Sequence, residues 1–225
     1  MGRPGLRTKL VSLTALSTAS VLATTAYWTD RSFEKQLLQT ATEASSVQSD
    51  ELRAVLEEQM LSGDLTLLNR LITEIGREPS VDWAALLDHE GRIKMSSRED
   101  AIGTVLSPAS SECQVCHSRV PSERQRSVTF FRHGEQVLRT VTPLINRPVC
   151  QTCHDAKNRV NGILLVDRSL RTVNDAVARS RNGVLLGSIA ALFALLGTLG
   201  LAVERLVLLR LERLRRVARE MGRGN

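Results

Sequence analysis

Hydrophobic and polar positions divide this chain of 225 residues into two uncharged apolar runs and a mixed segment between them. The runs are residues 10–28 and 183–203, and neither contains a charged side chain. A helix rises about 1.5 Å per residue, so a run of this length crosses a hydrocarbon core about 30 Å thick. The pattern predicts two transmembrane helices with residues 29–182 between them.

Each apolar run also has an alternative interpretation. The first run is rich in Thr and Ser, and its basic start and small residues at 23–26 are typical of a cleaved signal peptide. It ends in Tyr27 and Trp28, a pair that suits a membrane interface and therefore favours a retained anchor. For the second run, the alternative is a buried core helix.

The segment after the first run has the apolar spacing of helices. Residues 30–75 predict a helix that is interrupted at Ser62-Gly63-Asp64, where Asp64 is suited to cap a shorter second helix. Near the other end, residues 168–181 predict a helix that continues into the second apolar run without a linker.

Between these helices the pattern changes to that of strands. Two stretches each place β-prone segments on both sides of a short turn that contains glycine, which predicts two hairpins. The strands are residues 81–88, 92–97, 127–132 and 135–145, and the turns are His89-Glu90-Gly91 and His133-Gly134. Residues 162–167 predict a last strand. The predicted fold class is α+β, an antiparallel sheet with long N-terminal helices.

The net charge of +6 at pH 7 is concentrated at the two ends of the chain. Residues 1–9 carry three basic side chains and residues 204–225 have a net charge of +4, whereas residues 29–182 have −1. Basic segments beside a membrane span stay in the cytoplasm, so both termini are predicted to be cytoplasmic and the middle segment exported. That segment lacks the clustered cations of a nucleic-acid surface, and nucleic-acid binding is not expected.

All four cysteines lie in two copies of one pattern, CQVCH at residues 113–117 and CQTCH at residues 150–154. Two thiols three residues apart can form thioethers with the vinyl groups of one haem, and the adjacent histidine then ligates the iron. The spacing therefore predicts haem c, two per chain. The predicted thioether residues are Cys113, Cys116, Cys150 and Cys153, and the predicted proximal iron ligands are His117 and His154.

Two other interpretations of the cysteines remain open. A Cys₄ zinc site would use all four thiols, and local disulfides would suit an oxidising compartment, but both leave the two trailing histidines unexplained. The sixth iron ligands are sought among His89 and His133, in the predicted turns, and Met95, in a predicted strand. Each of these three also has an ordinary interpretation, as an exposed turn histidine or a core methionine.

Two segments carry a resemblance to a known family. LLDHEGRIKMSS at residues 86–97 and PLINRPVCQTCHDAKNRVNGILLVDRSL at residues 143–170 resemble the haem-c-bearing PAS-like or Cache-like sensor domains of bacterial transmembrane receptors, the histidine kinases and chemoreceptors. The resemblance covers roughly residues 30–182. It implies a PAS-like or Cache-like sheet in the periplasm, held by the bacterial inner membrane, and a homodimer formed through the membrane and relay helices.

The C-terminal residues 204–225 resemble the first helix of a HAMP signal-relay module, with Leu211, Leu214, Val217 and Met221 on one stripe. Arg210 stands where HAMP modules usually have Pro, and the chain ends before a second HAMP helix. The alternative is a basic amphipathic helix beside the membrane.

These observations predict a membrane-bound sensor that responds to redox state or to a small gaseous ligand and relays the signal through the HAMP-like helix. The competing hypotheses are a membrane-anchored dihaem cytochrome for electron transfer and a structural membrane protein with unoccupied motifs. No motif of an enzyme active site is present in the sequence, so a kinase activity would belong to an output domain outside it. The second motif precedes the last strand closely, so His154→Ala is predicted to uncouple signalling more than His117→Ala.

Overall fold

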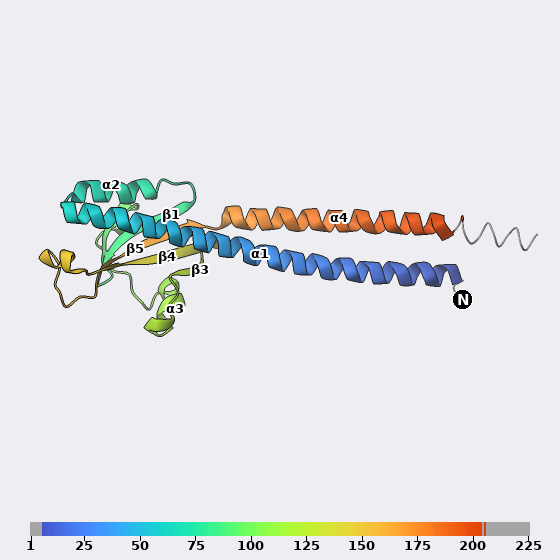
Figure 1. The fold of residues 1–225 in the computed structure, drawn as a ribbon, viewed down its shortest axis with the longest axis horizontal. Helices are drawn as coiled ribbons and strands as arrows, with labels where there is room; N and C mark the ends of the chain where they lie inside the picture. Colours follow the sequence, from blue (N-terminus) through green and yellow to red (C-terminus); the bar gives the residue numbers. More distant parts are fainter. Residues whose placement is uncertain (1–5, 204, 206–225) are drawn as a thin grey trace, which may run out of the picture. The chain divides into compact units, whose positions relative to one another are not determined.

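The computed structural model describes residues 6–203 and 205. Contacts group the chain into two compact units, one of Lys35–Asp175 and one of the two ends, Met1–Glu34 with Ala176–Asn225. The Lys35–Asp175 unit contains the whole sheet and both cysteine motifs (Figure 1).

Two helices precede the sheet, as the apolar spacing predicts. Helix α1 spans Leu6–Ser62 and helix α2 spans Leu65–Ile75. At the start of α2 the Asp64 carboxylate accepts a hydrogen bond of 2.8 Å from the backbone N–H of Leu67. The predicted interruption and its cap are therefore confirmed.

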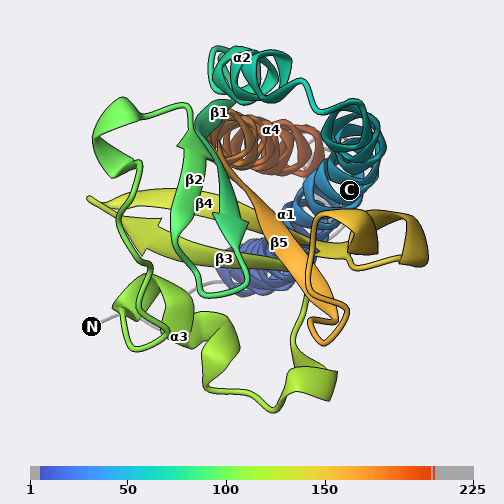
Figure 2. The ribbon, with the colours of Figure 1, turned by 90° about the vertical axis from the view of Figure 1, so that its left-hand side faces the viewer.

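Five strands follow and form a single sheet. They are β1 (Val81–Asp88), β2 (Ile93–Ser96), β3 (Ser127–Arg132), β4 (Glu135–Ile145) and β5 (Val160–Ser169). Their order is β2-β1-β5-β4-β3, and each neighbouring pair is antiparallel (Figure 2). The predicted α+β class and antiparallel sheet are confirmed.

Both predicted hairpins are present, and their turns have the backbone conformations that tight reversals need. Gly91 has φ +80° between β1 and β2, and His133 and Gly134 have φ +51° and +82° between β3 and β4. The last strand is longer than predicted, because Arg168 and Ser169 still pair with Leu138 and Val137 of β4. The following helix therefore begins at Arg171 and not at residue 168.

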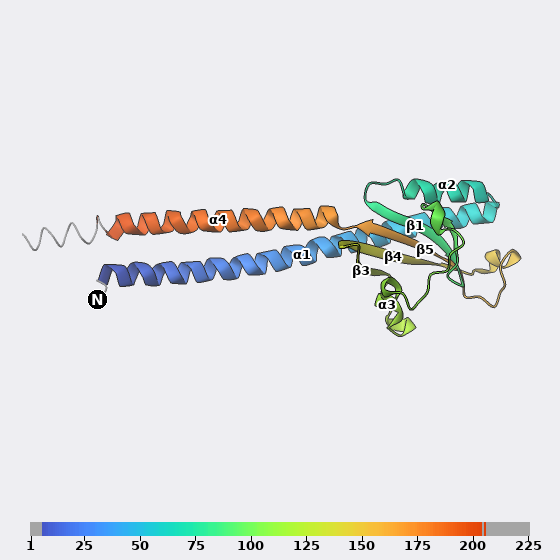
Figure 3. The same cartoon turned by 180° about the vertical axis from the view of Figure 1, so that it is seen from behind.

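Helix α2 and the C-terminal part of α1 cover one face of the sheet (Figure 3). Apolar side chains from both helices and from three strands form a buried core there. The core consists of Leu56, Leu68, Ile72, Ile75, Val81, Ala84, Leu86, Leu144, Leu164 and Val166.

The opposite face of the sheet has a smaller core and carries helix α3 (Ser111–His117), which lies on the other side of the sheet from α2 in Figure 2. The buried members of this core are Trp83, Ala85, Leu87, Ile93 and Leu165. The connections contain three 3₁₀ turns, η1 (Glu99–Ala101), η2 (Pro121–Glu123) and η3 (Pro148–Thr152).

Helix α4 spans Arg171–Val203, and Leu170 alone separates it from β5, so the predicted absence of a linker is confirmed. Within the described residues, one helical segment, Arg171–Ala202, is long and apolar enough to cross a membrane. The first apolar run is helical as part of α1, but it does not meet that criterion, so a membrane span at residues 10–28 stays a prediction. The predicted HAMP-like helix lies outside the described residues apart from Arg205.

Candidate functional site

The first cysteine motif lies on helix α3. Cys113 and Cys116 are three residues apart in this helix, so both thiols lie on the same side of it. Both side chains are partly buried, and the Cys116 thiol lies 3.8 Å from the carbonyl oxygen of Gln125, to which it donates a weak hydrogen bond. His117 is the last residue of the helix. The motif therefore presents two thiols and an imidazole within little more than one helical turn.

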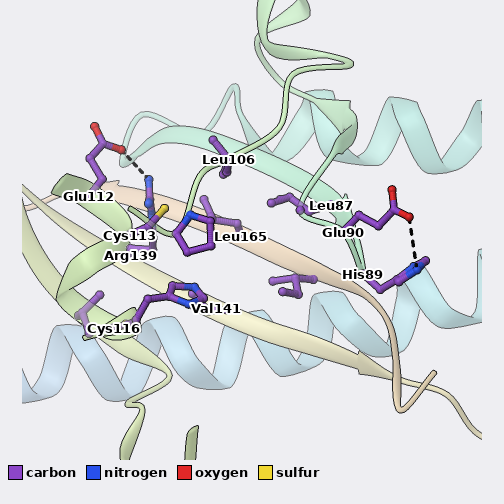
Figure 4. A pocket seen from close by; sticks show the side chains of 15 residues that line it. Leu87, His89, Glu90, Leu106, Glu112, Cys113, Cys116, Arg139, Val141 and Leu165 are labelled. Carbon is purple, nitrogen blue, oxygen red and sulfur yellow. Dashed lines mark hydrogen bonds and ion pairs between the residues drawn. The ribbon is translucent and has the colours of Figure 1, made fainter. Parts of the chain in front are cut away.

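A cavity separates this motif from the sheet (Figure 4). Its volume is about 210 Å³. Most of its wall is apolar and comes from Leu87, Leu106, Pro108, Val128, Val141, Ile163 and Leu165. Cys113, Cys116 and His117 all line it. An apolar cofactor tethered to the two cysteines fits this donor set and these walls.

His89, one of the candidate distal ligands, lines the same cavity. In Figure 4 it lies at the end of the cavity opposite Cys113 and Cys116. Its Nε2 is 3.9 Å from the Glu90 carboxylate, and its side chain is half exposed. The fold thus places one predicted distal candidate across the cavity from the first motif.

A cluster of four charged side chains lies beside this cavity, and two of its members, Arg139 and Glu112, line it. Arg139 from β4 donates to both oxygens of Asp167 from β5, at 2.7 and 2.8 Å. Arg132 from β3 donates to Asp167 at 2.6 Å and to Glu112 at 2.7 and 2.9 Å. Arg139 also donates to Glu112 at 3.1 Å. The charge cluster therefore ties α3 to three neighbouring strands.

Aromatic rings flank the arginines of this cluster, and its members differ in burial. The Arg139 guanidinium lies 4.7 Å from the centre of the Phe130 ring and 5.8 Å from that of Trp83. Asp167 is fully buried and Arg139 is 4% exposed, whereas the Glu112 side chain is 34% exposed. Glu112 is therefore the carboxylate of the cluster that solvent and a cavity occupant can reach.

The ionisation of the groups around the cavity follows from these contacts. The hydrogen bonds and charge of Arg132 lower the pKa of Glu112 from 4.5 to about 2, although partial burial opposes this. Burial raises the pKa of the Cys116 thiol. Burial and then the charge of Arg124 lower the pKa of His117, which favours the neutral imidazole that ligates metals.

The second cysteine motif lies in and after the turn η3, at the end of the sheet where β4 ends and β5 begins. In Figures 1 and 3 the gold segment after β4 contains it. Cys150, Cys153 and His154 line a separate, smaller cavity of about 70 Å³. Its other lining residues include Met60 and Leu61 from α1 and Leu144 and Ile145 from β4. The second motif thus presents the same types of donor as the first, and Met60 adds a thioether to the residues that line its cavity.

Hydrogen bonds fix the loop that carries the second motif. The Asn146 side-chain amide donates to the carbonyl oxygens of Asp155 at 2.9 Å and Asn158 at 2.8 Å. Arg147 donates to the Glu57 carboxylate of α1 at 2.5 Å. The loop is therefore held by the end of β4 and by α1.

The structure does not bring the other two distal candidates to either cavity. His133 lies exposed in the β3–β4 turn. Met95 stands opposite Leu86 and packs against the core under α1 and α2, on the face of the sheet away from α3. Neither residue lines the cavity at the first or the second motif.

The arrangement of the thiols bears on the two alternatives to haem. The four cysteines are free thiols and lie in two separate cavities, two in each. In the part of the chain that the structure describes, no group of three or more His, Cys, Asp or Glu side chains is placed to hold a metal ion. A single Cys₄ zinc site would require the two motifs to meet, which this fold does not provide.

The charge cluster and Met60 are the functional candidates that the sequence patterns did not indicate. A signal for the cluster is present, since Arg139 directly follows Val137-Leu138 and Asp167 directly follows the apolar residues 163–166. Charged side chains are almost never fully buried without a partner, so two such positions in neighbouring strands indicate an ion pair. Met60 gives no such signal, because its spacing in α1 equals that of a core residue.

Residues 52–171 match the family model of the sensor of methyl-accepting chemotaxis sensory transducers, class 40H. The chain belongs to this family. The matched segment includes both cavities, the charge cluster and the first residue of α4. The expected receptor sensor domain, of the chemoreceptor type and periplasmic, is therefore confirmed, and the family favours a sensor over an electron carrier. No curated protein matches the chain.

Proposed function

We propose that this chemoreceptor sensor carries two covalent c-type haems, one in each motif cavity, and senses redox state or a small gaseous ligand. The observation that supports this proposal is the position of the motifs. Each CxxCH sequence lines its own cavity, and the first cavity is walled mainly by apolar side chains. Without a shared role, two cysteine pairs would not be expected to have the same spacing, the same adjacent histidine and a cavity beside each.

The residues of the chain have distinct roles in this proposal. Cys113 with Cys116, and Cys150 with Cys153, form the thioethers, and His117 and His154 ligate the two irons. His89 is the distal candidate for the first cavity and Met60 for the second, because each lines the cavity concerned. When bound, a haem supplies an iron whose charge changes by one unit on reduction and which can bind NO, CO or O₂.

The signal would leave the sensor through α4. A homodimer formed through the membrane helices and a HAMP-like helix at residues 204–225 would relay it across the inner membrane. Both termini are then cytoplasmic, as the basic ends of the chain indicate.

Haem stoichiometry tests the proposal. The chain, produced with the cytochrome c maturation machinery, should contain two haems in a pyridine haemochrome assay and keep them on a denaturing gel. Changing Cys113 and Cys116 to Ala should leave one haem, and changing Cys150 and Cys153 as well should leave none. Gln114→Ala and Gln151→Ala, which alter the exposed variable positions of the motifs, should retain both.

Two results would contradict the proposal. Zinc without haem in the purified chain would exclude haem attachment. Equal kinase output from a dimeric receptor chimera in reducing and oxidising conditions and with NO, CO or O₂, with both haems redox-active, would exclude sensing and favour the electron-transfer cytochrome.

A further inference from the structure

The charge cluster offers a direct route from the first cavity to the helix that leaves the sensor. We infer that Glu112 is a positioning residue that couples the occupant of the first cavity to strand β5 and through it to α4. This inference rests on the proposed sensor function. It states that α4 responds to the occupant of the first motif and not to that of the second.

The contacts of Glu112 connect the two ends of this route. Glu112 lies in α3 directly before Cys113, so a displacement of the tethered occupant moves its backbone. Its carboxylate shares Arg132 and Arg139 with Asp167, over hydrogen bonds of 2.6 to 3.1 Å. A shift of α3 therefore changes the partners of the two arginines that also hold Asp167 of β5.

Asp167 lies where β5 passes into α4. It is four residues before Arg171, the first residue of α4, and both of its oxygens accept hydrogen bonds within the cluster. The Leu170 N–H donates to the carbonyl oxygen of Gln136 at 3.0 Å, so the junction is also fixed to β4. A short, rigid connection transmits small displacements, whereas a flexible linker dissipates them.

The second motif lies at the other end of β5. Ten residues of strand, about 30 Å at about 3.3 Å per residue, separate that end from α4. The polar contacts of its loop are made with Asn146 after β4 and with Glu57 of α1, not with the charge cluster. The second motif is therefore close to β5 in the sequence but lies a whole strand away from α4.

The solvent exposure of each side chain in the cluster determines which of its ion pairs can break and re-form. Asp167 and Arg139 are buried, and separating them would leave unpaired charges in the interior. Glu112 is partly exposed, so water can replace its contacts when α3 moves. Glu112 can therefore detach while the Arg139–Asp167 pair persists, which gives the cluster two arrangements that the occupant can bias.

Hydrogen exchange of the full chain tests this inference. Exchange at residues 160–175 is compared between the chain with its first haem and the C113A/C116A variant, each with and without Glu112→Gln. Loss of the occupant should change protection in this segment by at least about threefold when Glu112 is present, and by much less in E112Q. Glu135→Gln is the matched control, because it breaks the exposed Arg171–Glu135 pair at the same junction but does not contact α3.

Failure of this inference can be distinguished from failure of the proposed function. A haemochrome assay on the same samples first establishes whether the first motif carries haem. If it does, an E112Q response equal to that of the wild type overturns the coupling. If it does not, haem binding there fails, and the comparison of E112Q with E135Q in haem-free protein tests the coupling. Faster exchange at residues 165–169 in E112Q alone supports it, and equal exchange in both variants overturns it.

Discussion

At the scale of single residues, the two arginines of the charge cluster show how the sensor tolerates charge in its interior. Arg139 is 4% exposed and Asp167 is fully buried, yet their charges are paired, because Nε and Nη2 of Arg139 donate to the two Asp167 oxygens. Arg132 also donates to Asp167, although its buried Nη1 has no hydrogen-bond partner. Removing one partner of such a pair costs far more than the pair itself contributes, because the remaining charge stays buried without compensation.

Asp167→Asn should therefore destabilise the chain strongly. The substitution leaves two guanidinium groups with one partly exposed carboxylate between them, and breaking buried pairs of this kind costs about 3–5 kcal/mol. The free energy of unfolding, from urea denaturation, measures the loss. Glu135→Gln at the exposed Arg171 pair serves as control, and a loss for D167N as small as for E135Q would contradict the buried pair.

The pKa of Glu112 predicts a specific dependence of stability on pH. Arg132 lowers this pKa from 4.5 to about 2 in the folded chain, so the contribution is complete above pH 4.5 and is lost as pH falls toward 2. Glu112→Gln does not titrate, and at neutral pH it should cost about 1–2 kcal/mol after allowance for solvent screening. The difference in melting temperature between wild type and E112Q should shrink over this acidic range, and a constant difference would exclude the ion pair.

Sequence patterns located the residues of the two motifs but not their surroundings. The spacing of Cys113, Cys116 and His117 is local and therefore visible in the sequence. The charge cluster joins residues that are 20 to 35 positions apart, and His89 reaches its cavity only because β1 and β5 are neighbours. Such contacts depend on strand order, which no local pattern contains.

At the scale of elements, the hairpins and their strands could be predicted almost to the residue. Alternating burial and turns at Gly91 and His133-Gly134 fix the bounds of the four hairpin strands, three of which agree completely. Helix α3 was not predicted, because its seven residues are too few to display an apolar period. The bounds of β5 were underestimated, since pairing with β4 extends the strand into polar residues.

The break between α1 and α2 permits a test of one element boundary. Asp64→Ala removes the hydrogen bond to the Leu67 N–H and should cost about 1 kcal/mol. The loss should appear in global unfolding, because α2 contributes the buried residues Leu68, Ile72 and Ile75 to the core. Asp64→Asn retains a capping oxygen and should stay close to wild type in urea denaturation. Equal losses for both variants would contradict the capping role.

At the scale of the whole molecule, the fold alone does not determine which side of the membrane each end of the chain lies on. The apolar runs and the charges beside them predict it. The family assigns the domain to a chemoreceptor sensor, and Arg171–Ala202 has the length and composition of a span. The orientation of the chain still depends on the basic residues at its ends. Three lie in residues 1–9, and seven arginines follow residue 203.

The topology of the chain is therefore predicted from these charges. A reporter that is active only outside the cytoplasm should be active when fused after Asn161 and silent when fused after Met221. An active wild-type fusion after Met221 would show that the C-terminal arginines cross the membrane and would contradict the orientation.

The second span can be tested by making it polar. Leu192→Arg with Leu196→Arg places two charges in the middle of the segment, each of which costs about 2.5–3.5 kcal/mol at the centre of a membrane helix. The segment should then fail to stop transfer, and the Met221 fusion should become active. The matched pair Leu192→Ala with Leu196→Ala shortens the same side chains without adding charge and should leave this fusion silent. A Met221 fusion that is silent with both pairs, while the Asn161 fusion stays active, would mean that the apolarity of this segment does not hold the C-terminal end in the cytoplasm.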